Sequence, residues 1–390
     1  MNLLYLTHHR RFKCFARPGL FARLMVKAGH QVTVVCTADT ARFTDRESES
    51  EGVRYLEIAD VLPGQLRSGW DPVSILRRLR RLSGSSFDAL HLFETRPATI
   101  FPALQLARRT GLPLVMDWND WWGRGGLIRE LRPRWYQILF EGFETYFEEH
   151  FRTRATATTV ISHALGERAA SLGVPHNTIH WIPGAADIRR FQPMDQAQTR
   201  AALGLDPQAF LMGFSAMDVI NDAPFVFKAA ARVVAGEPRA RLVMMGRDFP
   251  VLHELARNHG ISDRFIHLGL FPQDRLPVPL AAMDVFLLPY TQRISNLGRW
   301  PNKVGDYLAS GRPVITNPTG EMSQLFEHQE GGLLVGETPE AFASAILDLA
   351  RDPARRIELG RQARALAERE LAPERMTERL LRVYATLPVR

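Results

Sequence analysis

The sequence predicts an α/β protein with two doubly wound, Rossmann-like domains that face each other across a cleft. The chain has 390 residues, more than the roughly 100–200 of one typical domain. Short apolar strands alternate with helical stretches, which is typical of a parallel sheet covered on both faces. The alternation pauses at the polar segment 190–208, which contains Pro193 and Pro207, and then restarts. We therefore expect one domain on each side of this segment.

The N-terminal half begins with a strand in MNLLYLT, followed by a helix that Gly29 ends. The next strand contains VTVV and is too apolar to have a solvated face. The alternation then continues to about residue 182. We expect strands at residues 2–7, 31–36, 89–92, 114–117, 157–161 and 178–182, and helices at 20–28, 98–109 and 135–151.

The C-terminal half repeats this pattern and ends in a long helical stretch, residues 339–387. The sequence divides into domains at 1–190 and 191–365, with a last helix at 366–390. We expect strands at residues 210–215, 240–245, 265–268, 285–289, 313–316 and 332–335.

Composition narrows the class of protein. Hydrophobic residues make up 45% and charged residues 23%, as in ordinary globular proteins. No apolar run reaches the roughly 18–20 residues that span a bilayer, and MNLLYLT is too short for a signal-peptide core. Two cysteines without CxxC spacing argue against a disulfide framework or a zinc site. We expect a cytoplasmic protein whose net charge of +7 suits an anionic partner, which composition alone does not choose.

Five segments, in order along the chain, resemble the retaining GT-B glycosyltransferases of family four, also called glycosyltransferase group 1. They cover nearly the whole sequence, and their number and order make chance similarity improbable. The segments are MNLLYLT with AGHQVTVVCTAD, ATTVISHAL with GVP, WIPGAADIRRFQP, HLGLFPQDRLPVPLAAMDVFLLPY, and PNKVGDYLASGRPVITNPTGEMSQLFEHQEGGLLV.

The resemblance implies a nucleotide-sugar donor held by the C-terminal domain and an acceptor held by the N-terminal domain. It implies that the last helix crosses back to the N-terminal domain. It also implies that neither a metal nor any cofactor is required besides the nucleotide-sugar co-substrate.

The expected donor site begins at Asn302 and Lys303, the start of a helix after strand 285–289. A helix N-terminus offers free N–H groups and a positive dipole end to a diphosphate, and Lys303 adds a charge. Asp306 stands where the family's second motif glutamate binds the donor ribose; alternatively it only satisfies the helix dipole. The family's first motif glutamate is replaced by Gly298.

Three more positions belong to the expected donor site. Arg247 follows strand 240–245 and is either a diphosphate ligand or a solvated loop residue. Glu321 lies where the family's loop approaches the donor sugar, or it only charges the next helix. Gly269 is at the position where the family's backbone approaches the base.

The family's usual diphosphate cations are missing after strand 210–215. Asp218 and Asp222 stand nearby, and each would repel a diphosphate by ~1 kcal/mol in wet surroundings. Either Lys228, Arg247 or Arg299 replaces the missing cations, or the donor lies differently, or there is no nucleotide donor.

The segment DWNDWW after strand 114–117 resembles the DxxDxW pattern of one branch of the family. Asp117, Asn119 and Asp120 are the expected catalytic residues, with Asp120 placed to orient an acceptor hydroxyl or accept its proton. Trp121 would stack on an acceptor sugar. The alternative is an aspartate that caps the next segment and tryptophans that fill the core.

Two basic loops complete the expected acceptor site. Arg124 lies in a glycine-rich loop and Arg10 in the loop above the first strand, where either could meet an acceptor phosphate. The alternatives are a turn that requires glycine and a solvated basic loop.

A basic amphipathic helix is expected from Asp71 to Leu82, with Asp71 as N-cap. Such a helix can lie on an anionic leaflet at the inner face of the cell membrane, which would suit a lipid-linked acceptor. An ordinary surface helix has the same pattern.

These observations lead to two main hypotheses. The first is a retaining glycosyltransferase that adds a hexose-like sugar in surface polysaccharide or glycolipid synthesis. The second is a non-catalytic relative that binds sugar nucleotides or serves as a partner subunit. Nothing resembles a base-reading motif, so nucleic acid is not an expected partner.

Overall fold

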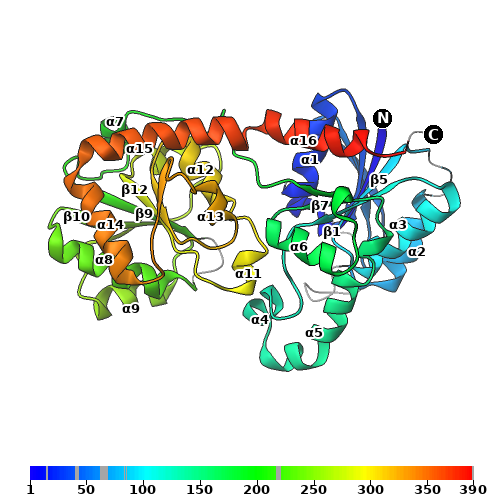
Figure 1. Ribbon diagram of the computed structural model, residues 1–390, viewed down its shortest axis with the longest axis horizontal. Helices are drawn as coiled ribbons and strands as arrows, with labels where there is room; N and C mark the ends of the chain where they lie inside the picture. The colour runs from blue at the N-terminus through cyan, green and yellow to red at the C-terminus, as the bar shows by residue number, and fades with distance from the viewer. Residues whose placement is uncertain are drawn as a thin grey trace. The chain divides into compact units, whose positions relative to one another are not determined.

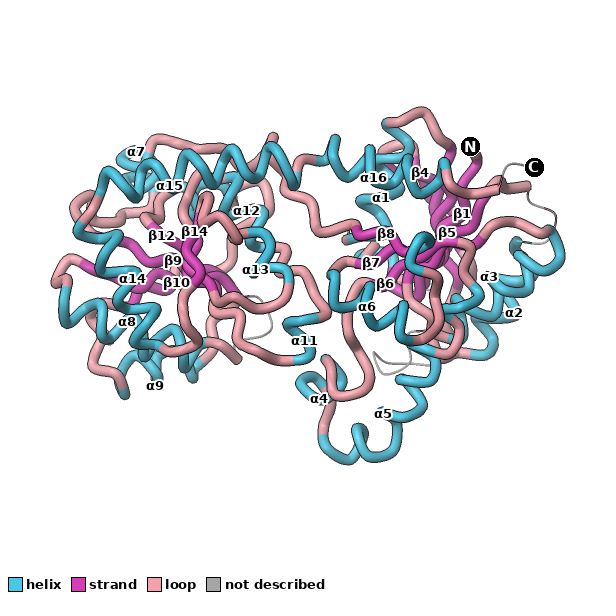
Figure 2. Tube along the Cα trace, in the orientation of Figure 1, coloured by secondary structure: helices cyan, strands magenta, loops and turns pink. Residues whose placement is uncertain are grey.

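The computed structural model describes residues 1–14, 16–39, 44–61, 69–82, 84, 86–216 and 221–388. The chain forms two compact units, each with a sheet at its centre and helices around it (Figures 1 and 2). Unit 1 comprises Met1–Pro183, Arg293–Trp300 and Met376–Arg390, and unit 2 comprises Gly184–Gln292 and Pro301–Arg375. The boundary expected after residue 190 thus falls just inside unit 2.

The sheet of unit 1 has eight strands among the described residues, in the order β3-β4-β2-β1-β5-β6-β7-β8. All neighbours are parallel except β3 and β4, which form an antiparallel hairpin at one edge. The six expected strands are present, but the hairpin was not expected. The strands are β1 Asn2–Arg10, β2 Gln31–Thr37, β3 Arg46–Ser50, β4 Val53–Ile58, β5 Ala89–Phe93, β6 Leu114–Trp118, β7 Ala157–Val160 and β8 Ile179–Trp181.

Side chains of β1 alternate between the two faces of this sheet, as the two-residue period of a strand requires. Leu4 and Leu6 pack in the core with residues of α2 and α3. Tyr5 packs against Phe93, and its hydroxyl hydrogen-bonds that of Tyr384 in α16 at 2.7 Å. The helices of unit 1 are α1 Arg17–Lys27, α2 Pro72–Leu82, α3 Pro97–Thr110, α4 Leu127–Leu131, α5 Arg134–Glu149, α6 His163–Ser171, α11 Ile294–Leu297 and most of α16 Pro373–Ala385.

Helix α2 corrects one expectation. Asp71 caps it as predicted, accepting a hydrogen bond from the Val73 N–H at 2.8 Å. However, Arg78 is fully buried and donates to the Thr7 carbonyl at 2.8 Å, whereas Leu76 is exposed. The expected helix is present, but Arg78 does not belong to its basic surface. Hydrogen bonds inside unit 1 replace those that this residue loses to water.

The sheet of unit 2 has six strands among the described residues, in the order β11-β10-β9-β12-β13-β14, and all neighbours are parallel. Counted within the unit this is the order 3-2-1-4-5-6 of a Rossmann fold. Each expected strand is present. The strands are β9 Phe210–Ala216, β10 Ala240–Gly246, β11 Phe265–His267, β12 Val285–Leu288, β13 Val314–Thr316 and β14 Gly332–Leu334.

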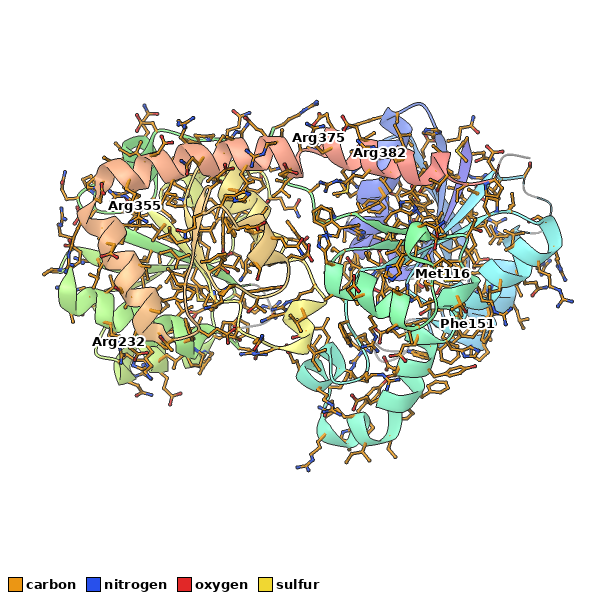
Figure 3. All side chains as sticks on the ribbon, in the orientation of Figure 1. Met116, Phe151, Arg232, Arg355, Arg375 and Arg382 are labelled. Carbon is orange, nitrogen blue, oxygen red and sulfur yellow. The ribbon has the colours of Figure 1, made fainter. Side chains whose placement is uncertain are left out.

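One face of this sheet packs on α8 and α14 in a core that includes Phe214, Phe227 and Phe342. Side chains such as Arg232 and Arg355 point outward from the unit, whereas Met116 lies inside unit 1 (Figure 3). The helices of unit 2 are α7 Gln196–Ala202, α8 Ala223–Gly236, α9 Pro250–Asn258, α10 Pro277–Ala281, α12 Lys303–Ala309, α13 Glu321–Leu325, α14 Pro339–Arg351 and α15 Pro353–Leu366, with a π-helical turn at Ala367–Leu371.

The expected continuous helical stretch at 339–387 is divided between α14, α15 and α16. Asp352 and Ala372 interrupt it, and a proline follows each of them at the first position of the next helix. Among the described residues, no helix is both long and apolar enough to cross a bilayer.

Candidate functional site

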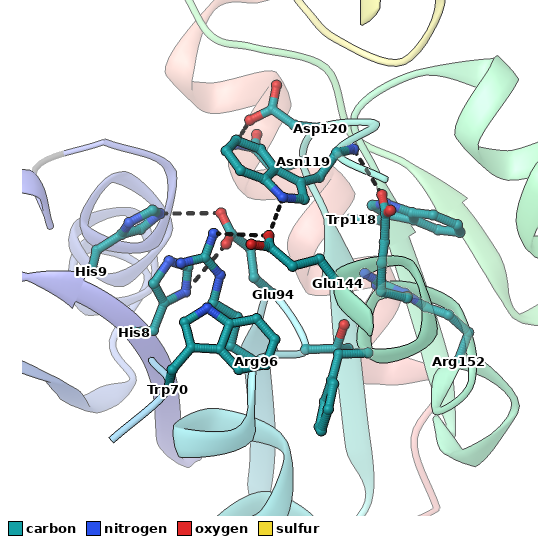
Figure 4. Close-up of a pocket in the computed structure, with 14 residues that line it drawn as sticks. His8, His9, Trp70, Glu94, Arg96, Trp118, Asn119, Asp120, Glu144 and Arg152 are labelled. Carbon is teal, nitrogen blue, oxygen red and sulfur yellow. Dashed lines mark hydrogen bonds and ion pairs between the residues drawn. The ribbon is translucent and has the colours of Figure 1, made fainter. Parts of the chain in front are cut away.

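The candidate site of unit 1 lies where the strand order reverses, between β1 and β5. In an open parallel sheet, chains leave such neighbouring strands in opposite directions, which opens a crevice at their carboxyl ends. A pocket of about 190 Å³ lies there (Figure 4). Its lining residues are His8, His9, Trp70, Glu94, Thr95, Arg96, Trp118, Asn119, Asp120, Trp122, Glu144, Phe147, Glu148 and Arg152.

Two backbone irregularities direct three side chains toward one another in this pocket. The pairing of β1 with β2 shifts register between Leu6 and Arg10, and Glu94 has a left-handed φ of 63° directly after β5. Such features redirect side chains and occur often at functional sites. Glu94 accepts ion-pair contacts from His8 Nδ1 at 3.2 Å and from His9 Nε2 at 3.3 Å (Figure 4).

The charges of this cluster are strongly coupled. Burial lowers the pKa of His8 well below its usual value, and the neighbouring Glu94 opposes that shift. Burial raises the pKa of Glu94, but His8, His9 and Arg96 together bring it below its usual range. The ligand atoms of His8, His9 and Glu94 lie within 4.8 Å of one another, so these residues could hold a divalent cation.

The tryptophan-rich loop after β6 is anchored by carboxylates on one face of α5. Glu148 accepts hydrogen bonds from the Trp118 indole at 3.0 Å and from the Gly123 N–H at 2.6 Å. Glu144 accepts from the Trp122 indole and from the Tyr136 hydroxyl. Since these carboxylates replace solvent for the loop's donors, α5 fixes the loop that carries Asn119 and Asp120.

Asp120 is an acid of the pocket whose pKa is raised, in contrast to that of Glu94. Burial raises its pKa to about 7, and the negative charge of Glu94 adds to that shift, while Arg299 and His9 oppose it. Asn119 donates a hydrogen bond to its Oδ2 at 3.2 Å. A carboxyl group that titrates near neutrality can both accept and return a proton at physiological pH.

Asp117 lies under the pocket and does not line it. It is 1% exposed and accepts hydrogen bonds from Arg17 at 2.8 and 2.9 Å and from Thr159 at 2.5 Å. This burial does not suit the catalytic role expected for Asp117, because a substrate could not reach its oxygens. The residue instead ties β6 to α1 and β7.

Trp121 also differs from its expected place. Trp122, not Trp121, lines the pocket. The Trp121 ring stacks with the guanidinium of Arg168 at 4.1 Å and packs under Gly298, where a Cβ would come within 2.3 Å of the Trp121 Cβ. This contact explains why glycine stands where the family has its first motif glutamate.

The two basic residues expected to meet an acceptor phosphate lie outside this pocket. Arg10 donates to the Asp39 carbonyl at 3.1 Å. Arg124 pairs with Glu149 at 2.8 Å and lines a second, more open hollow of about 1170 Å³ beside α5. The guanidinium groups that line the pocket belong to Arg96 and Arg152, neither of which was predicted.

Sequence reasoning also missed Glu94, Trp70, Glu144 and Glu148. A signal was available for Glu94, because it comes two residues after the strand predicted at 89–92 and directly after the observed strand β5, whose carboxyl end belongs to the functional edge of the sheet. The left-handed backbone of Glu94 and the approach of α5 depend on tertiary structure and leave no local pattern.

The corresponding position of unit 2 lies between β9 and β12. Lys303, at the start of α12, donates from Nζ to the Ser215 carbonyl at 3.0 Å. The Ser215 N–H donates to the Tyr307 hydroxyl at 3.2 Å, and the Tyr307 ring stacks on Phe286 at 3.7 Å. The structure thus brings Lys303 to the switch point of the second sheet.

Asp306 and Asn302 flank Lys303 on the same segment. Burial raises the pKa of Asp306 to about 7, with a further contribution from Asp187, while Arg190 opposes the shift. Asn302 is exposed, and its side chain does not cap α12.

The other expected donor residues follow the neighbouring strands of the same sheet. Arg247 is exposed directly after β10, and Glu321 is buried at the start of α13. Gly269 has a φ of 79°, which favours glycine, and its carbonyl accepts from the Gly246 N–H at 2.9 Å. Asp218 lies outside the described residues.

Two parallel Rossmann-like sheets and a functional residue cluster at each switch point define an α/β protein of the GT-B class. Solved structures of that class match over nearly the full chain. Sucrose-phosphate synthase from Thermosynechococcus elongatus has a TM-score of 0.76 at 17% identity and covers 99% of this chain and 98% of its own. HepE from Anabaena, solved with UDP and glucose, has a TM-score of 0.73 at 15% identity and covers 99% and 100%.

Family models identify the chain more closely. A glycosyl transferase 4-like domain matches residues 18–185, and the glycosyl transferases group 1 domain matches residues 208–352. The chain belongs to the group 1 glycosyltransferases of family four, a retaining family with the GT-B fold.

Two relatives illustrate the activities found in this family. A GDP-mannose-dependent monoacylated alpha-(1-6)-phosphatidylinositol monomannoside mannosyltransferase from Corynebacterium glutamicum is 28% identical over 60% of this chain. A D-inositol 3-phosphate glycosyltransferase from Rhodococcus jostii is 31% identical over 50% of this chain. The chain spans only 64% and 45% of the length of these two relatives.

Proposed function

We propose that this chain transfers a sugar from a nucleotide-sugar donor to a glycan or lipid-linked acceptor, with retention and without a metal. The observation that carries the proposal is the pocket of unit 1, in which Asp120 titrates near neutrality beside Glu94. The family membership and the second residue cluster in unit 2 support the donor half of the reaction.

The pocket suits an acceptor with a sugar or polyol ring. Trp70 and Trp122 offer aromatic faces to the apolar face of such a ring, and Glu94 and Asp120 accept hydrogen bonds from its hydroxyls. Arg96 adds a positive charge that suits a phosphate on the acceptor. The two relatives described above act on inositol-containing acceptors, which combine a polyol with a phosphate.

In the proposed reaction, the bond from the sugar C1 to the donor phosphate breaks and a bond from C1 to the acceptor oxygen forms. The acceptor proton passes to Asp120 or to the leaving phosphate. Lys303 neutralises the diphosphate as negative charge develops there, which stabilises the transition state electrostatically. The protein otherwise contributes by positioning the two substrates.

We place this activity in surface polysaccharide or glycolipid synthesis, in the cytoplasm at the inner face of the membrane. Docking through the helix from Asp71 to Leu82 receives little support. Arg78 is buried, Arg77 pairs with Asp45 at 3.6 Å, and Arg81 pairs with Glu47 at 2.8 Å.

A thermal-shift screen with UDP-, GDP-, ADP- and CMP-sugars tests the donor half of the proposal. A ligand that binds only the folded protein raises its melting temperature. We expect one nucleotide to do so, and we expect Lys303→Ala and Asp306→Ala to remove the shift. If no nucleotide sugar shifts a cooperative melting transition, the alternative of a non-catalytic partner subunit replaces this proposal.

A further inference from the structure

Helix α5 exposes an uninterrupted apolar stripe. Trp135, Ile138, Leu139, Phe143 and Tyr146 follow the spacing i, i+3, i+4, i+8 and i+11, which places them on one side of a helix. All five are exposed, with Ile138 at 76% and Leu139 at 67%. Gly142 fills the remaining position of this stripe, so it contains no charged residue.

The charged side chains of α5 lie outside this stripe, and its carboxylates are less exposed than the basic side chains near them. Its four carboxylates, of which Glu141 is the most exposed at 17%, turn toward the loop after β6 and toward basic partners. The basic side chains beside the helix remain largely in solvent, including Arg129, Arg124 and Arg134. Exposed guanidinium groups therefore border the stripe, whereas the carboxylates that pair with two of them are largely buried.

We propose that the α5 stripe, defined as Trp135, Ile138, Leu139, Phe143 and Tyr146, inserts into the interface of an anionic bilayer. An apolar face with a basic border is the arrangement by which helices lie in a membrane surface. Trp135 and Tyr146 stand at the two ends of the stripe, and their amphipathic rings favour the headgroup level. The sixteen-residue helix is too short to span the membrane, so it lies along the surface.

The stripe is continuous with the candidate acceptor pocket. The Phe143 ring lies 5.1 Å from the rings of both Trp70 and Phe147, and those two residues line the pocket. A lipid held by the stripe would therefore have its headgroup close to Asp120 and Glu94. This step rests on the proposed function and specifies its acceptor as one presented by a membrane.

Vesicle flotation with the full-length protein tests the proposal. The probes are vesicles of phosphatidylcholine alone and vesicles that also contain phosphatidylglycerol. We expect binding to the anionic vesicles, and a loss of about tenfold or more in the partition coefficient of Ile138→Glu/Leu139→Glu, because two apolar side chains that would insert into the bilayer become charged. The control is Ile357→Glu in unit 2, where Ile357 is 72% exposed on α15 and should leave binding unchanged.

Three outcomes would overturn the proposal. Equal flotation of the double variant and the wild type would show that the stripe does not bind the membrane. Loss of flotation in Leu76→Glu alone would assign docking to α2 instead. If neither vesicle binds and the double variant turns a dimer into a monomer in sedimentation, the stripe is a contact between two copies of the chain.

The nucleotide thermal shift separates this test from the proposed function. Both glutamate substitutions lie outside the pocket, so the double variant should melt cooperatively and keep the wild-type shift. Loss of flotation with an intact shift supports the docking surface. No shift in the wild-type protein would contradict the proposed function, whatever the vesicles show.

Discussion

The two sheets share a strand order around their first strand, yet their switch points carry different chemistry. In unit 1 the ends of β1, β5 and β6 supply His9, Glu94 and Asp120, a coupled group of titratable side chains. In unit 2 the end of β9 and the start of α12 supply a carbonyl and Lys303. Topology therefore fixes where a ligand binds, and the residues after each strand decide which ligand it is.

The largest expected effect comes from removing the titratable carboxyl group of Asp120, which changes unit 1 and leaves unit 2 intact. Asp120→Asn should lower the rate of sugar transfer by roughly 100-fold or more, because an amide cannot accept the acceptor proton. The nucleotide thermal shift should remain, since Lys303 is intact. Asp274→Asn, an exposed aspartate of unit 2, is the matched control. A transfer rate within twofold of wild type would remove Asp120 from the chemistry.

The next effect belongs to unit 2. Lys303→Met should weaken nucleotide-sugar binding about tenfold, the size of one charge-assisted hydrogen bond, as measured by calorimetry. Lys27→Met on α1 replaces an exposed lysine and should leave the dissociation constant unchanged. Equal losses in both variants would mean that overall charge, not the switch point, attracts the donor.

The third prediction concerns pH. Because the pKa of Asp120 is about 7, its ionised form increases as the pH rises through neutrality. The transfer rate should therefore rise from pH 6 to about pH 8 and then level off, if the carboxylate accepts the proton. Asp120→Asn should flatten this part of the profile. A wild-type rate that falls over the same interval would contradict the assigned protonation state.

The smallest expected effect is an increase in stability, which we predict for one substitution in each unit. The pKa values of Asp120 and Asp306 are about 7 when folded and 3.8 when unfolded, so ionisation destabilises the folded chain as the pH rises through this interval. Asp120→Asn and Asp306→Asn should each raise the melting temperature by roughly 2–4 °C at pH 8, and by much less at pH 4. Calorimetry at the two pH values measures the difference. Equal increases in melting temperature at pH 4 and pH 8 would contradict the raised pKa values.

Much of the fold could be predicted because most of its strands are short apolar segments that can be recognised in the sequence. Segments such as Val285–Leu288 are short and wholly apolar, since both faces of a parallel sheet are covered. The hairpin partner Arg46–Ser50 reads RESES and is largely solvated at the sheet edge, so it carries no hydrophobic signal. Buried Arg78 misled the interpretation of α2 for the opposite reason, because its hydrogen-bond partners come from distant strands.

The candidate site was less predictable than the fold. Asp120 could be expected because it follows a strand in a recognisable motif. Trp121 and Trp122 are adjacent in sequence, but only Trp122 lines the pocket. Trp121 packs against Gly298, whereas the Trp122 indole donates to Glu144, and neither contact can be recognised in the sequence. Arg96 and Glu94 lie next to a predicted strand, but the turn that directs them depends on a left-handed residue that is not glycine.

The hydrogen-bonded chain Tyr5–Tyr384–His91 has a consequence for how the protein is made. Its hydroxyl and imidazole groups are buried in unit 1, and Tyr384 supplies their partner from a point 379 residues after Tyr5. During synthesis on the ribosome, the first strand emerges long before Tyr384 does. The centre of the N-terminal sheet therefore stays incompletely satisfied until Tyr384 has been translated, and a nascent chain that stalls earlier would be an attractive target for chaperones and proteases.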